Sequence, residues 1–192
     1  VSIEAEVVNM LEKCRSIAGH IDGIVHCAGV LRDALITNGK AAVGCLDVWN
    51  AKALSAWHLH QHTKLDKLQF FVCFSSITSA IGNIGQSAYG AANRFLDALM
   101  TERQSKGLMG VSIRWPAVAE VGMAASKSEV VDSKLFVSLQ DVEVVLQNVF
   151  SSQYGDLKVI TLLPNRSIIS ESHLKQQFQL METDNSNFNR QS

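Results

Sequence analysis

The chain has 192 residues, of which 47% are hydrophobic and 18% charged; this excludes a disordered chain and is enough for one domain with its own core. Because 17 Lys and Arg balance 18 Asp and Glu, for a net charge of -1, no general basic field favours binding to nucleic acid or to a membrane surface. No apolar run approaches the roughly 20 residues needed to cross a bilayer. The cysteines form no CxxC pair, which argues against structural zinc and favours a reducing, cytoplasmic setting.

Hydrophobic periodicity and turn residues divide the chain into alternating helices and strands. The expected helices lie near residues 3–18, 41–64, 87–105 and 142–150. Short apolar runs typical of buried parallel strands lie at 21–27, 68–74, 111–115 and 157–163. Residues 117–138 follow no clean period and are interpreted as a flap. We expect one domain at residues 1–163, followed by a flexible tail or linker at 164–192.

This alternation predicts an α/β fold in which helices cover both faces of a parallel sheet. Ligands of such sheets bind at the carboxyl ends of the strands. Three clusters of small or polar residues follow expected strands: Ala28-Gly29, Ser75-Ser76 and Trp115-Pro116. The sequence therefore predicts that these clusters meet at one rim of the sheet.

Four polar residues near that rim form a chemical constellation. Tyr89 and Asn93 are four residues apart and share one helix face, while Ser76 ends the preceding strand and Lys52 lies on the helix before it. A phenol, whose reference pKa is near 10, becomes a useful general acid when an ammonium group stabilises its phenolate and lowers that pKa. A neighbouring hydroxyl can donate to a carbonyl oxygen that gains negative charge. The pattern favours protonation of a carbonyl oxygen while hydride reaches its carbon.

The segments around these residues resemble the ketoreductase domain of polyketide synthases and animal-type fatty acid synthases, a branch of the short-chain dehydrogenase/reductase superfamily. The matching segments are His26-Cys27-Ala28-Gly29-Val30-Leu31-Arg32-Asp33, Phe74-Ser75-Ser76, the run from Gly82 to Asn93, Trp115 and Gly122-Met123. The resemblance covers roughly residues 1–163. In this branch the lysine comes from the helix before the serine strand, and asparagine stands where ordinary reductases of the superfamily have lysine.

The resemblance implies a role for each site residue. Tyr89 would donate a proton to the β-keto oxygen, Ser76 would polarise that oxygen, and Asn93 would belong to the proton relay. Lys52 would contact the ribose of NADPH and lower the pKa of Tyr89. The remaining cofactor contacts would come from Ala28, Gly29, Trp115, Pro116 and Ala117. The substrate would be a β-ketoacyl thioester carried by the phosphopantetheine arm of an acyl-carrier domain.

The stereochemical outcome is read from two further positions. In one class of the family, an acidic motif follows the Ala-Gly; Asp33 keeps its second Asp, whereas Arg32 replaces the first. The other class places Trp three residues before the tyrosine, where this chain has Gln86. These residues favour the D-hydroxy, B-type product.

A dinucleotide-binding sheet begins with a strand and a Gly-rich turn that binds the pyrophosphate, but no GxGxxG occurs in this sequence. The resemblance implies that the chain is N-terminally truncated. It would hold the catalytic part of a doubly wound sheet that lacks its first strands, so that the missing N-terminal half is a required partner and the isolated chain is inactive. Val1-Ser2 then corresponds to the end of the segment after the third strand.

Other functions and other sites remain open from the sequence alone. The chain could be a non-catalytic remnant that serves as a scaffold or partner segment, or a free-standing short-chain dehydrogenase acting on small alcohols; Asn93 in place of lysine argues against the latter. Taken singly, Tyr89, Ser76 and Lys52 would be ordinary surface or capping residues. His58 and His62 share a helix face, but they lack the other ligands of a metal site, so we expect no metal.

Overall fold

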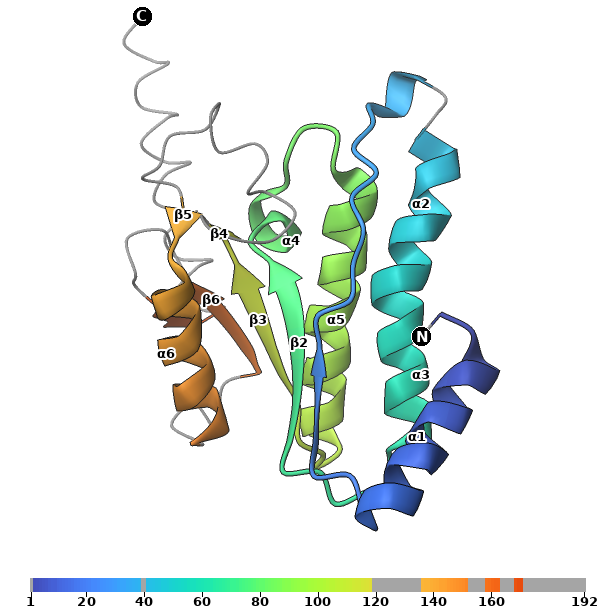
Figure 1. Cartoon of the computed structure of the whole chain (residues 1–192). Coiled ribbons are helices and arrows are strands. Elements are labelled where there is room, and N and C mark those ends of the chain that lie inside the picture. The colour runs from blue at the N-terminus through green and yellow to red at the C-terminus, as the bar shows by residue number, and fades with distance from the viewer. Residues whose placement is uncertain (1, 39–40, 119–135, 152–157, 163–167, 171–192) are drawn as a thin grey trace, which may run out of the picture.

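The computed structural model describes residues 2–38, 41–118, 136–151, 158–162 and 168–170. Its centre is a five-stranded sheet with the order β1-β2-β3-β6-β7, formed by Gly23–His26, Phe70–Ser76, Val111–Trp115, Val159–Leu162 and Ile168–Ser170 (Figure 1). The first four strands are parallel, and β7 is antiparallel to β6. The prediction of an α/β fold with a parallel sheet is confirmed.

Helices cover both faces of this sheet, because each helix has one apolar side to bury. The longer helices are α1 (Glu4–Ala18), α2 (Ala41–Trp49), α3 (Ser55–His62), α5 (Ser87–Ser105) and α6 (Leu139–Phe150). On one face, α1, α3 and α5 bury a cluster that includes Val7, Leu11 and Phe71. On the other face, α6 packs Val145 and Val149 against β2, β3 and β6. Figure 1 shows α6 on the opposite side of the sheet from α5 and α1.

The register of the strands decides which residues reach the functional rim. Ser76 is the Cα partner of Trp115 at the end of β2 and β3, and His26 is the partner of Cys73 in the neighbouring pair. The backbone N–H of Ile77 donates to the carbonyl of Trp115 at 3.0 Å and closes this edge. The carboxyl ends of the three strands therefore meet, as the sequence predicts.

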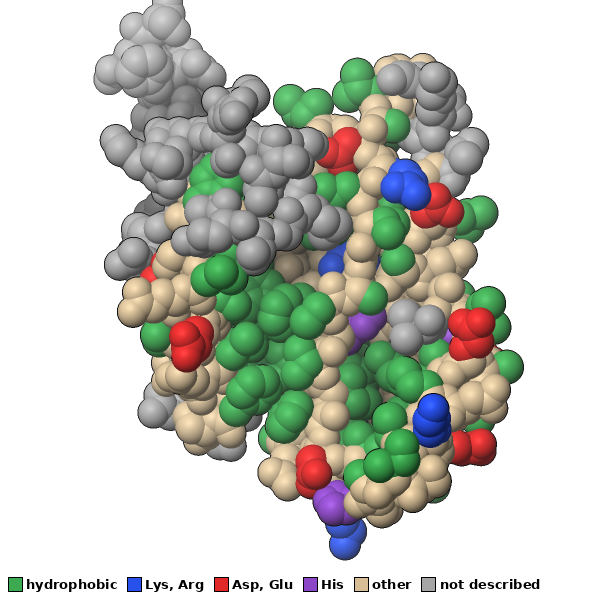
Figure 2. Space-filling view, viewed as in Figure 1, with side chains coloured by type: hydrophobic (Ala, Val, Ile, Leu, Met, Phe, Trp, Pro, Cys, Tyr) green, Lys and Arg blue, Asp and Glu red, His purple; other side chains and the backbone are tan. Residues whose placement is uncertain are grey.

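Strand β1 is an edge of the sheet, paired only with β2 among the strands described. Its residues alternate between the two faces: Ile24 and His26 are buried under the helices, whereas Val25 is 42% exposed on the face that α6 covers farther along the sheet. Hydrophobic side chains gather on that face between α6 and β1 (Figure 2). The sheet thus offers an open, apolar flank along β1.

The helix expected at residues 41–64 is not uniform. It consists of α2, a π-helical turn at Asn50–Leu54 (η2) and α3, which ends at His62. The π turn contains neither Pro nor Gly, so the sequence gives no signal for it. The helical stretch is confirmed as far as His62, but the π turn inside it was not predicted, and Lys52 lies in the middle of that turn.

The loops and the tail differ from expectation in two places. Within the expected flap, Ala117–Val118 (β4) and Phe136–Val137 (β5) pair as a small parallel sheet, while residues 119–135 lie outside the described residues. The expectation of a flexible tail at 164–192 is wrong at residues Ile168–Ser170, because they form β7 and pair with β6. A strand of three residues is too short for periodicity to reveal. The rest of the tail lies outside the described residues.

Two short elements and a cap complete the fold. They are a 3-10 turn at Ile36–Asn38 (η1) and a helix at Thr78–Ile81 (α4), which follows the rim of β2. Ser138 and Asp141 form a reciprocal capping box at the start of α6. No helix in the described segments is long and apolar enough to cross a membrane. All four cysteines are free thiols.

Candidate active site

Tyr89 and Asn93 enter the site from the first turns of α5, one helical turn apart. The side-chain N–H of Asn93 donates to the backbone carbonyl of Tyr89 at 2.8 Å, which fixes the asparagine on the same face. The turn before the helix needs glycine at position 85, where φ is +75°, a conformation that other residues rarely adopt. Position 89 is therefore presented toward the end of β2.

Ser76 ends β2 beside this helix. Its hydroxyl oxygen accepts the backbone N–H of Thr78 at 3.3 Å, and the neighbouring Ser75 donates its hydroxyl to the backbone carbonyl of Asn93 at 3.2 Å. The end of β2 and the start of α5 are thus tied together by hydrogen bonds. The predicted meeting of Ser76, Tyr89 and Asn93 at one rim is what the structure shows.

Lys52 reaches the same place from the π turn and is only 2% exposed. Its Nζ donates to the backbone carbonyl of Phe74 at 3.0 Å and lies 5.3 Å from the centre of the Tyr89 ring. Burial lowers the pKa of Lys52 to about 8. The lysine is therefore still mostly charged at neutral pH, and it is held beside the phenol.

The pKa of Tyr89 departs from expectation. Burial raises it, and this effect outweighs the side chains of Asn93 and Ser76, which lower it. The expectation of a lowered pKa is therefore wrong for the chain as described, because desolvation of the phenolate outweighs the groups that stabilise it. A raised pKa keeps Tyr89 protonated at neutral pH, which is the form a proton donor needs.

The predicted cofactor-binding residues divide into two groups. Ala28 and Gly29 follow β1 at the rim, and a Cβ added to Gly29 would lie 3.3 Å from both Cγ and Nζ of Lys52. The side chain of Trp115 instead belongs to the core under α6, with its ring centre 5.3 Å from that of Phe74, and Pro116 is buried. The predicted contact of the Trp115 side chain with the cofactor is therefore not what the described core shows.

Two features of these residues fit a nicotinamide nucleotide. Gly29 leaves a close approach to the strand end, where any side chain would press on Lys52. In addition, Oδ1 of the fully buried Asn93 has no hydrogen-bond partner in the described part of the chain. A buried acceptor without a partner is costly unless a ligand or water satisfies it.

Asp33 and Gln86 contact each other between the loop after β1 and the loop before α5. The amide nitrogen of Gln86 lies 3.1 Å from each carboxylate oxygen of Asp33, and the N–H of Ala34 donates to the carbonyl of Gly85 at 2.9 Å. The two loops are therefore joined at two points. The two residues singled out for stereochemistry form one of these contacts.

The remaining histidines have separate partners. His62 contacts Glu4 at 2.8 Å, and Nδ1 of His60 contacts Arg103 at 2.8 Å, whereas His58 is buried elsewhere on α3. Within the described ranges, no group of three or more His, Cys, Asp or Glu residues could hold a metal ion. His58 and His62 do not form a shared site.

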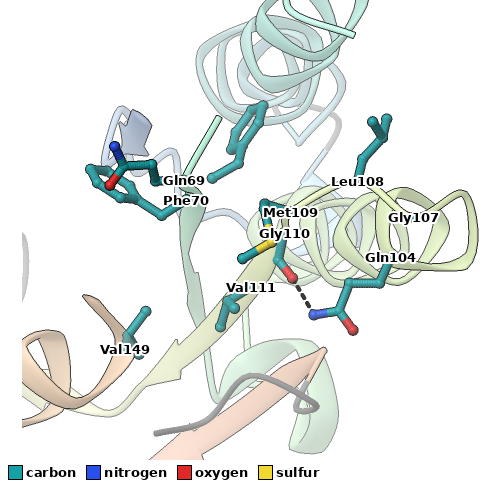
Figure 3. Close-up of a pocket in the computed structure, with 10 residues that line it drawn as sticks. Gln69, Phe70, Gln104, Gly107, Leu108, Met109, Gly110, Val111 and Val149 are labelled. Atoms are coloured by element: carbon teal, nitrogen blue, oxygen red, sulfur yellow. Dashed lines mark hydrogen bonds between the residues drawn. The ribbon is translucent and has the colours of Figure 1, made fainter. Parts of the chain in front are cut away.

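A pocket of about 220 Å³, shown in Figure 3, lies where β2 and β3 begin, at the end of β2 opposite to Ser76. Its lining includes Phe70 and Val111, which begin β2 and β3, whereas Ser76 and Trp115 end the same strands. The pocket contains no charged side chain, and its amide Gln104 donates to the carbonyl of Gly110. The pocket therefore lies apart from the predicted tetrad of Lys52, Ser76, Tyr89 and Asn93.

Two groups make contacts around the tetrad that the sequence did not predict, although the sequence indicates that His26 is either part of the cofactor floor or a packed core residue. His26 and Ser55 contact the backbone of the π turn around Lys52. Asp97, on the buried side of α5, binds Arg114 of β3 at 2.8 Å. A charged residue inside a helix that is otherwise rich in apolar residues was the available signal for Asp97.

Residues 1–120 match the family model of the KR domain. The chain belongs to the KR domain family. This agrees with the resemblance read from the sequence, and the tetrad lies within the matched residues.

The chain's relatives in this family are polyketide synthases. It is 46% identical over 96 residues to the phenolphthiocerol synthesis polyketide synthase type I Pks15/1 of Mycobacterium bovis, which covers 50% of this chain and 4% of that protein. It is 38% identical over 145 residues to naringenin synthase of Pestalotiopsis fici, which covers 74% of this chain and 5% of that protein. Reducing polyketide synthase FUB1 of Gibberella fujikuroi is 41% identical over 114 residues, covering 57% of this chain and 4% of the synthase.

Solved ketoreductases share the fold. The ketoreductase domain from the bacillaene assembly line matches with a TM-score of 0.71 and 25% identity, covering 92% of this chain and 43% of that one. An N-terminal ketoreductase from the macrolactin assembly line matches with a TM-score of 0.66 and 28% identity, covering 78% and 30%. The chain thus spans less than half of these ketoreductases and a few per cent of the synthases.

Proposed function

We propose that this chain carries the catalytic part of an NADPH-dependent ketoreductase, which reduces a β-ketoacyl thioester to the β-hydroxyacyl product within a polyketide or fatty acid synthase. The observation that carries the proposal is the convergence of Tyr89, Ser76, Asn93 and the buried Lys52 at one rim of a parallel sheet. Membership of the KR domain family supports it.

Each side chain of the tetrad would have its own role in reducing the ketone. The hydroxyl of Tyr89 donates its proton to the ketone oxygen, and Ser76 donates a hydrogen bond that stabilises the negative charge developing there. The ammonium of Lys52 then stabilises the phenolate that is left behind. When bound, NADPH supplies the hydride that the carbonyl carbon accepts. Ala28, Gly29, Lys52, Tyr89 and the backbone at residues 115–117 would hold its nicotinamide end.

A further segment of the ketoreductase domain would supply the pyrophosphate site. Three facts support this: the sequence lacks a Gly-rich phosphate turn, the chain covers 29–43% of the solved ketoreductases that it matches, and β1 is an open apolar edge. A parallel strand pairing with β1 would bury Val25 and extend the sheet toward the missing phosphate-binding turn.

The substrate would arrive on the phosphopantetheine arm of an acyl-carrier domain in the cytoplasm. Asp33 and Gln86 would line the side by which it enters, since their contact joins the two loops in front of Tyr89. On this basis we propose the D-hydroxy product. The carrier protein and the product follow from the family rather than from any bound group.

The test is an assay of the chain joined to the segment that completes the ketoreductase domain. A β-ketobutyryl N-acetylcysteamine thioester is the substrate, NADPH and NADH are compared, and the product is analysed for its configuration. We expect NADPH-dependent formation of the D-β-hydroxy thioester. A folded domain that binds NADPH but reduces no ketone would favour the alternative of a non-catalytic remnant. An L product would reject the stereochemical reading alone.

A further inference from the structure

The π turn that carries Lys52 has an unusual backbone hydrogen-bond pattern. The N–H of Ser55 donates to the carbonyl of Asn50, five residues back, and also to the carbonyl of Lys52. Single π turns inside helices occur often at functional sites, because they displace one residue from the regular helical path. Something outside the helix must therefore hold this turn in register.

His26, the last residue of β1, makes that contact. Its Nε2 lies 2.9 Å from the backbone carbonyl of Lys52 and 3.2 Å from the hydroxyl of Ser55, which in turn donates to the carbonyl of Ala51 at 2.7 Å. A carbonyl oxygen can only accept, so Nε2 must carry the hydrogen. Burial lowers the pKa of His26 to about 4, so the ring is neutral at physiological pH and adds no charge beside the lysine.

The same strand exit also holds the side chain of this lysine. Gly29, three residues after His26, lies against the stem and the Nζ of Lys52, leaving no room for a Cβ without displacing them. The backbone of Lys52 is thus fixed by His26, and its side chain is guided by Gly29. From this position Nζ reaches the carbonyl of Phe74 and the Tyr89 ring.

We propose that His26 is a positioning residue, whose Nε2–H fixes the π turn and so places the ammonium of Lys52 beside Tyr89. The catalytic consequence rests on the proposed function, whereas the placement of Lys52 does not. His60 is the control residue. It is also a buried histidine, but its ring contacts Arg103 instead of the π turn.

The first experiment requires no catalysis. The ε-carbon of Lys52 is titrated by NMR in the 192-residue chain labelled with ¹³C-lysine, and its signal is assigned by its loss in Lys52→Met. His26→Phe keeps a ring but removes the donor, and we expect the pKa of Lys52 to rise by about one unit or more toward its ordinary value, because a displaced ammonium regains hydration. His26→Gln, whose amide N–H can replace Nε2–H, should restore the wild-type titration. His60→Phe should leave it unchanged.

The second experiment measures kcat for ketone reduction in the completed domain. His26→Phe should lower kcat by up to about 100-fold through misplacement of Lys52, and His26→Gln should recover most of it. A folded His26→Phe chain whose Lys52 titrates as in the wild type overturns the proposal. If His26→Phe does not fold, His26→Leu replaces it: this variant also lacks the donor and should raise the pKa of Lys52, and an unchanged titration in a folded His26→Leu chain likewise overturns the proposal. If the wild-type domain reduces no ketone, the proposed function fails, but the lysine titration still decides the positioning role.

Discussion

Tyr89 is the residue on which the proposed chemistry depends most directly. Tyr89→Phe removes the donated proton but keeps the ring under Lys52. We expect kcat of the completed domain to fall by at least about 100-fold, the lower end of a general acid's usual contribution, while the affinity for NADPH stays near normal. Steady-state kinetics and a binding titration measure the two effects. An unchanged kcat would exclude Tyr89 as the acid.

Lys52 illustrates a conflict between stability and function at one residue. Its pKa of about 8, lowered by burial from 10.5, means that the folded chain carries a poorly hydrated ammonium at pH 7. Lys52→Met should therefore abolish reduction yet raise the free energy of unfolding by about 2 kcal/mol, after the lost bond to Phe74 is counted. Urea denaturation at pH 7 measures this change. A destabilised variant would show that the bond outweighs the cost of burial.

His26 makes stability depend on acid pH. Its folded pKa of about 4 lies below the ordinary 6.5, so between these values the unfolded chain binds more protons than the folded one. The stability that the neutral His26 contributes to the folded chain is present above pH 6.5 and is lost as pH falls toward 4. From pH 6.5 to 5 we expect the free energy of unfolding to drop by about 2 kcal/mol more than in His26→Gln. Urea denaturation of both chains at the two pH values measures this difference. An equal drop in the free energy of unfolding for the wild type and His26→Gln would contradict the prediction.

At the scale of elements, α5 carries Tyr89 and is tied to both α4 and the sheet through Asp97. Asp97 on this helix accepts hydrogen bonds from Ser79 of α4 and from Ser112 and Arg114 of β3, at 2.6 to 2.8 Å. Both ends of the Arg114–Asp97 ion pair are almost fully buried. This network holds α4, which follows Ser76, and β3 against the helix that carries Tyr89.

Neutralising Asp97 should therefore be costly. Asp97→Ala removes the carboxylate that Arg114 contacts at 2.8 Å in the buried core, and we expect the free energy of unfolding to fall by about 3–5 kcal/mol. The matched control is Asp47→Ala, which breaks the exposed pair with Arg32 and should cost at most about 1 kcal/mol. Thermal or urea unfolding distinguishes them. Equal losses would mean that the buried pair does not hold these elements together.

At the scale of the whole molecule, we expect the open flank along β1 to limit what the chain can do alone. The unpaired edge and the exposed Val25 belong to a sheet whose phosphate-binding turn is absent from this sequence. We expect the isolated chain to bind NADPH weakly or not at all and to associate as its concentration rises. Fluorescence titration with NADPH and analytical ultracentrifugation measure both properties. Tight binding by a monomer would contradict the need for a further segment.

The sequence by itself determined the main helices, the four parallel strands of the sheet and the meeting of Ser76, Tyr89 and Asn93. These follow from local rules: apolar periodicity separates helices from strands, residues four apart share a helix face, and parallel strands end at one rim. The same reading included Lys52, on the helix before the strand that ends at Ser76, and the resemblance to the family implied its role toward the cofactor and Tyr89.

Only the tertiary structure decided how these residues are held and what their surroundings do to them. The π turn at Lys52, its bond to His26 and the raised pKa of Tyr89 all depend on contacts between segments far apart in the sequence and on burial. The same holds for the core position of the Trp115 side chain and for the strand at Ile168–Ser170. Hydrogen bonding and desolvation are properties of the packed chain, so no local pattern contains them.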